Sequence, residues 1–138
     1  MIISIDNFVK RETEGLKGAE EYSLNGSYNF KEQSNPSSSI IKMDFEGNFI
    51  GKMNDSKGVI ANVSAIKGKI IEKDNYLLMS FIKIYGAFVC NVYYFLYRPF
   101  DGKDDFEGEY VGGWSLDKRF CPLEKETSNT ARLVLSKL

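Results

Sequence analysis

Lys83 is the residue whose place in the sequence most clearly indicates chemistry. It lies in an apolar, strand-like segment, Tyr76–Tyr85, where side chains alternate between two faces. Its neighbours on one face would be Leu77, Met79, Phe81 and Tyr85. If that face is interior, the ammonium group needs an acid such as Asp44, a ligand carboxylate or a route to water, because an unpaired buried charge is costly. The opposite face is also largely apolar, so the sequence leaves open whether Lys83 is buried or solvated.

Catalysis has few candidate residues in this chain. The sequence contains no histidine, which removes the commonest general base, the commonest zinc ligand and the usual partner of a nucleophilic serine or cysteine. The densest group of carboxylates is Asp101, Asp104, Asp105, Glu107 and Glu109. Their spacing differs from that of an EF-hand calcium loop, and a polar turn that runs into a strand accounts for them. We therefore expect no catalytic residue, no metal site, no cofactor and no enzymatic activity.

The composition limits the kinds of binding partner and the cellular location that we expect for this protein. The chain has 138 residues, the size of one domain, and its 18 basic and 19 acidic residues give a net charge of −1. This balance argues against nucleic acid and against a membrane surface as partners. The first residues are apolar over too short a span for a signal peptide, so we expect a cytoplasmic protein with free thiols at Cys90 and Cys121. A disulfide would require the loop around Cys121 to fold back over the strand that carries Cys90.

Most of the sequence is typical of strands. Range 45–51 returns as range 106–112, and in both copies aromatic residues and glycines alternate with other residues. Rings and glycines on one face suit a strongly curved sheet, in which bulky and empty positions interdigitate. The strand-like ranges, separated by turn residues, are 22–31, 40–53, 59–72, 76–85, 89–97, 105–116 and 130–137. We expect 40–53 to be one long strand that bends at Gly47, and 33–39 to be a Ser/Asn/Pro-rich loop.

These elements predict an all-β fold. Sequential strands with short turns favour an antiparallel up-and-down closed β-barrel of about eight strands, because closure removes exposed strand edges. Residues 1–21 form a short helical or irregular N-terminal segment that could cap one end, and residues 22–138 form the barrel domain. A barrel of this size is either filled by side chains or holds one small ligand.

Several short motifs resemble the calycin superfamily, the lipocalin-like and avidin-like barrels. They are Gly26-Ser27-Tyr28, Phe81-Ile82-Lys83-Ile84-Tyr85, Gly112-Gly113-Trp114, and a last strand with Arg132 and Leu135. In that group a tryptophan of the first strand commonly packs against a basic residue of the last, so the resemblance implies that Tyr28 contacts Arg132. It also implies an eight-stranded barrel whose mouth admits a small, often apolar, ligand.

Two hypotheses for function follow. The first is a non-enzymatic barrel that binds a small apolar or aromatic ligand, with Lys83 or Arg132 as the polar anchor. Its walls would be Tyr28, Phe49, Phe81, Tyr110 and Trp114. The second is a structural or interaction module with a filled barrel, in which the aromatic outer face of range 76–97 binds another copy of the chain or a partner protein. Range 89–97 is apolar on both faces, which is why cover by a homo-oligomer, a partner or the N-terminal segment is expected.

Overall fold

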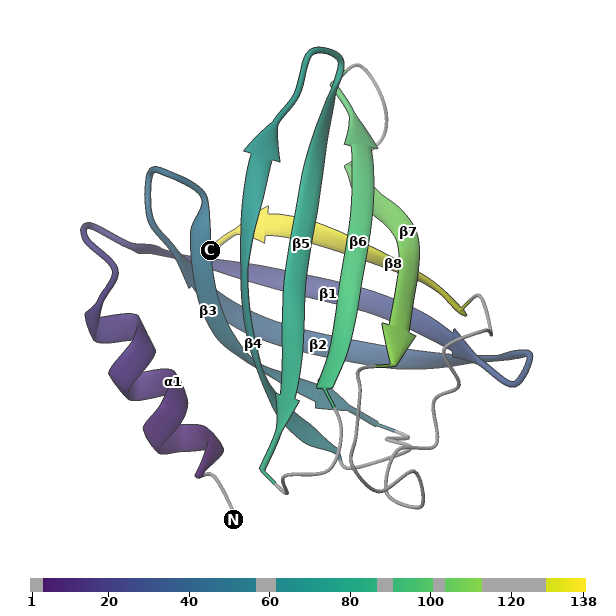
Figure 1. Ribbon diagram of the computed structural model, residues 1–138, viewed down its shortest axis with the longest axis horizontal. Coiled ribbons are helices and arrows are strands. Elements are labelled where there is room, and N and C mark those ends of the chain that lie inside the picture. Colours follow the sequence, from purple (N-terminus) through teal and green to yellow (C-terminus); the bar gives the residue numbers. More distant parts are fainter. Residues whose placement is uncertain (1–3, 57–61, 87–90, 101–103, 113–128) are drawn as a thin grey trace.

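The protein is an eight-stranded antiparallel barrel with one helix outside it (Figure 1). The computed structural model describes residues 4–56, 62–86, 91–100, 104–112 and 129–138. Its elements are α1 (Ile5–Glu14), β1 (Glu20–Phe30), β2 (Gln33–Met43), β3 (Asn48–Asp55), β4 (Val63–Glu72), β5 (Tyr76–Tyr85), β6 (Asn91–Pro99), β7 (Asp105–Gly112) and β8 (Asn129–Lys137). Each strand pairs with the next in the sequence, and β8 pairs with β1 to close the barrel. The predicted fold class is confirmed.

The second copy of the repeat behaves as its alternation predicts. Phe106 and Tyr110 of β7 are buried in the barrel, and Gly108 lies between them on the same face. A Cβ atom at Gly108 would come within 2.0 Å of the Phe95 carbonyl oxygen on β6. Glycine is therefore needed here for the close approach of two neighbouring strands in a strongly curved sheet.

The first copy of the repeat begins in a turn and continues into β3, where Phe49 and Gly51 are buried, and this corrects the prediction of one bent strand over 40–53. β2 ends at Met43 and β3 begins at Asn48, and Phe45 between them is 87% exposed. The Asp44 carboxylate accepts hydrogen bonds from the backbone N–H groups of Glu46 and Asn48, and Gly47 has a φ of 91°. A side-chain acceptor and a left-handed glycine together favour a tight turn over continuation of the strand.

The predicted loop over 33–39 is also wrong, because these residues begin β2. The chain reverses at Lys31 and Glu32, which both have positive φ values. Within β2 the buried positions alternate and are mostly polar: Asn35, Ser37, Ser39 and Ile41. Serine and asparagine are typical of loops, so polar residues on an interior strand face disguised the strand.

Helix α1 covers the outer face of β3 and β4 rather than an end of the barrel (Figure 1). Ser4 caps it by accepting a hydrogen bond from the Asn7 backbone N–H. Two ion pairs join it to the barrel, Asp6 to Lys52 at 3.1 Å and Glu12 to Lys67 at 3.4 Å.

Candidate functional site

The structure shows that Lys83 lies inside the barrel. On β5 the buried side chains are Met79, Phe81, Lys83 and Tyr85, whereas the alternate residues face outward. Of the two faces that the sequence left open, the one that carries Lys83 is therefore interior. The side chain of Lys83 is only 2% exposed.

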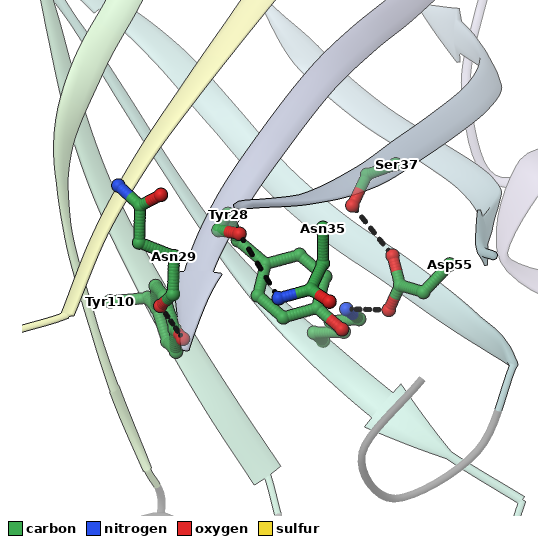
Figure 2. Close-up of polar contacts among 7 residues, drawn as sticks. Tyr28, Asn29, Asn35, Ser37, Asp55 and Tyr110 are labelled. Carbon is green, nitrogen blue, oxygen red and sulfur yellow. Dashed lines mark hydrogen bonds and ion pairs between the residues drawn. The ribbon is translucent and has the colours of Figure 1, made fainter. Parts of the chain in front are cut away.

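The partner of Lys83 is Asp55, the last residue of β3, whose side chain is also 2% exposed. The Lys83 ammonium donates to Asp55 Oδ2. The Ser37 hydroxyl donates to Oδ1 of the same carboxylate at 2.6 Å (Figure 2). Both carboxylate oxygens are thus satisfied by donors from different strands. Asp44, the acid considered from the sequence, precedes the opposite end of β3, in the turn between β2 and β3.

Aromatic rings surround the ammonium group of Lys83. Its Nζ atom lies 5.1 Å from the ring centroid of Tyr28, 5.6 Å from that of Tyr85 and 5.8 Å from that of Tyr94. These distances are within the range of cation–π attraction, which adds to the ion pair when water is excluded. Lys83 and the three tyrosines come from β1, β5 and β6, so the cluster exists only in the closed barrel.

A column of stacked rings connects this cluster to the rest of the interior. Tyr94 is stacked against Phe81 at 4.4 Å and against Tyr110 at 5.2 Å, and Tyr28 meets Tyr110 edge to face at 5.9 Å. The Tyr110 hydroxyl donates to the Asn29 carbonyl oxygen at 2.5 Å, as Figure 2 shows. Phe49 meets Phe81 edge to face at 6.0 Å. Four of the predicted wall residues, Tyr28, Phe49, Phe81 and Tyr110, therefore share one interior with Lys83, although their role as ligand walls stays a prediction.

The buried polar residues of the described chain gather toward one end of the barrel. Asn35, Ser37, Asp55, Ser64, Lys83 and Asn129 lie at or near the end where β1, β3 and β5 end and β2, β4 and β8 begin, and Ser39 lies farther along β2. The opposite half contains apolar residues such as Phe49, Met79 and Phe106. At the polar end, a surface groove of about 320 Å³ is lined by Ser37 and Asp55 among other residues. The ion pair thus lies beside a surface depression.

Burial shifts the protonation equilibria of this cluster. Loss of water lowers the pKa of Lys83, although the Asp55 charge opposes the shift. Burial, assisted by the Asp55 charge, raises the pKa of Tyr28 to about 12. Burial also raises the pKa values of Tyr85, Tyr94 and Tyr110. At neutral pH the tyrosines are therefore uncharged hydroxyl groups around a single ion pair.

Ser64 is a residue that sequence reasoning missed. It lies on β4 opposite Tyr85 of β5, it is 1% exposed, and its hydroxyl oxygen has no hydrogen-bond partner among the described residues. Asp55 and Ser37 were missed as well. Asp55 stands in a run of turn-forming residues, and no local pattern marks any of the three as interior.

The remaining predicted residues lie elsewhere. Arg132 points outward from β8 with a side chain that is 53% exposed, and it pairs with Asp105 and Glu107. The structure therefore does not bring it to the buried ring of Tyr28, as the resemblance implied. Trp114, Cys90 and Cys121 lie outside the described residues.

Comparisons with known proteins add no relative: no family model, curated protein or solved structure matches the chain. Among the described residues, no group of histidine, cysteine and acidic side chains could hold a metal ion. None of the helices in that part of the chain is long and apolar enough to cross a membrane.

Proposed function

We propose that this protein is a non-enzymatic barrel of the calycin type that binds a small molecule at its polar end. The observation that carries the proposal is the buried Lys83–Asp55 pair beneath three tyrosine rings. A buried ion pair contributes little net stability compared with well-packed apolar residues, so its presence needs a reason other than folding. Titratable groups with shifted pKa values beside a surface depression are typical of binding sites.

The arrangement supports a ligand that combines a ring with a polar group. Tyr28 and Tyr110 offer aromatic surface, and the ion pair offers both a donor and an acceptor. The groove that Ser37 and Asp55 help to line lies at this end of the barrel. Binding would consist of ring burial and one oriented polar contact, in the cytoplasm and without a cofactor, metal or nucleic acid.

Native mass spectrometry of the protein purified from its own host tests the proposal. We expect an added small-molecule mass on the wild type that is lost in Lys83→Met and in Tyr110→Ala. Lys42→Met is the matched control, because Lys42 is exposed on β2 and pairs with no described acid. An unliganded wild type, or equal loss of the added mass in Lys42→Met, would contradict the proposal.

A second candidate function rests on the outer face of β6. Tyr93, Phe95 and Tyr97 are 38%, 43% and 47% exposed there, and α1 lies on the other strands β3 and β4. Exposed aromatic residues in a row are typical of interaction surfaces. In this alternative the barrel is a structural or interaction module that self-associates or binds a protein partner. Sedimentation of Tyr93→Glu and Phe95→Glu tests it, since both changes should convert an oligomer to a monomer.

A further inference from the structure

We infer that the ligand of this barrel is a neutral molecule with a hydroxyl or amide group, and that the Ser64 hydroxyl is one of the groups that recognises it. The inference rests on the proposed function and narrows it. Two independent observations support it, the charge balance of the interior and the unpartnered oxygen of Ser64.

Among the described residues, the interior has no unpaired charged side chain. Lys83 and Asp55 neutralise each other, and they are the only buried charged residues in the described part of the chain. A ligand carboxylate would compete with Asp55 for Lys83, and a ligand ammonium would compete with Lys83 for Asp55. Either ion would leave an uncompensated charge in a site from which water is excluded, which is strongly unfavourable. A neutral ligand leaves the pair intact.

Ser64 supplies the second observation. Buried polar atoms in folded proteins nearly always have a hydrogen-bond partner, so a hydroxyl that finds none within the described part of the chain points to a bound group. Ser64 is opposite Tyr85, and the Tyr85 ring lies 5.6 Å from the Lys83 ammonium. The hydroxyl therefore belongs to the same polar end as the ion pair. Since a hydroxyl both donates and accepts, it suits a neutral hydroxyl or amide better than an ion that only accepts or only donates.

The ring-bearing part of the ligand follows from the surroundings of these polar groups. Tyr28, Tyr85 and Tyr94 all lie within 6 Å of Lys83 Nζ. A molecule bound at Ser64 and the ion pair would therefore lie beside these rings. Aromatic surface favours a flat, apolar body attached to the polar group.

Three probes with the same ring and different charge test the inference. Benzamide is neutral, benzoate is an anion and benzylammonium is a cation. Each is titrated into the full-length protein while backbone amide chemical shifts are followed by NMR. We expect benzamide to bind about 10-fold more tightly than either ion, with shifts at Ser64 and Tyr85.

In the same titration, Ser64→Ala should lower the affinity for benzamide by about 3- to 10-fold, which corresponds to the loss of one hydrogen bond. Ser80→Ala is the matched control, because Ser80 faces outward on β5. Tighter binding of benzoate or benzylammonium at the same residues would overturn the inference that the ligand is neutral, whereas the proposed function would still stand. Benzamide binding that Ser64→Ala leaves unchanged would overturn the role of Ser64. If no probe binds, the inference fails, and native mass spectrometry decides separately whether the barrel carries a ligand.

Discussion

Removing one charge of the Lys83–Asp55 pair should greatly lower the free energy of unfolding of the protein. Both charged side chains are only 2% exposed in the native state. Lys83→Met therefore leaves the Asp55 carboxylate buried, with the Ser37 hydroxyl as its remaining side-chain donor in the described part of the chain. Removing one partner of a buried pair typically costs about 3–5 kcal/mol. The loss of the tyrosine contacts to the ammonium places the expected value toward the upper part of that range. Small domains have unfolding free energies of about 5–15 kcal/mol, so the change is a large fraction of the total.

The complementary change Asp55→Leu should also destabilise, because it leaves the Lys83 ammonium buried without its counter-charge. The double variant Lys83→Met/Asp55→Leu removes both charges and places apolar side chains of similar size in the site. Its unfolding free energy should return to within about 1–2 kcal/mol of the wild type, or exceed it, since apolar replacement of a buried pair is often neutral or stabilising.

Urea unfolding followed by far-ultraviolet circular dichroism measures the free energy of unfolding of the wild type, both single variants and the double variant under the same conditions. Lys42→Met, an exposed lysine on β2, is the control and should change the unfolding free energy by less than about 0.5 kcal/mol. A loss of less than about 1 kcal/mol in Lys83→Met would show that the ammonium reaches water. A double variant as unstable as the sum of both single losses would show that the two charges are not coupled.

Three further predictions follow from the same contacts. Because burial raises the tyrosine pKa values above 10.0, the tyrosines stabilise the fold fully below pH 10 and lose this contribution as pH rises toward about 12 for Tyr28. The lowered pKa of Lys83 makes stability rise with pH, but only below pH 10.5, the pKa of lysine in the unfolded chain. Above pH 10.5 the free energy of unfolding should therefore fall, and it should fall less steeply in Tyr94→Phe, which lacks one buried tyrosine hydroxyl. A rise above that pH would contradict the assignment. Ser64→Ala should increase the unfolding free energy by about 1 kcal/mol without ligand, because it removes a buried hydroxyl that has no hydrogen-bond partner in the described ranges. A decrease would mean that the hydroxyl already has a partner in the folded protein. Gly108→Ala should lower the melting temperature measured by calorimetry, because its Cβ would meet the Phe95 carbonyl oxygen at 2.0 Å. Gly15→Ala, just after α1, is the control, because a Cβ there would come no closer than 3.4 Å to the Glu12 carbonyl oxygen. An unchanged melting temperature in Gly108→Ala would contradict the close packing of β6 and β7.

The sequence by itself determined the class of the fold and part of the barrel interior. Alternation of Phe106, Gly108 and Tyr110 predicts which face of β7 is interior, because side chains point to opposite faces at every step along a strand. The same rule identified Lys83 as a cation on an otherwise apolar face. These properties depend only on the geometry of the local backbone, which any strand shares.

Only the tertiary structure decided which acid meets Lys83 and which side of the barrel each strand presents inward. Asp55 and Lys83 are far apart in the chain, and the intervening strand β4 places them together through the register of a closed sheet. Both faces of β5 are apolar, so local periodicity could not choose between them, and closure of the barrel did. The polar residues Asn35 and Ser37 looked like a loop because their partners, Tyr28 and Asp55, become neighbours only when β1, β2 and β3 pair. Arg132 remained outside for the same reason: the register of β8 against β1 and β7 points its side chain toward Asp105 and water.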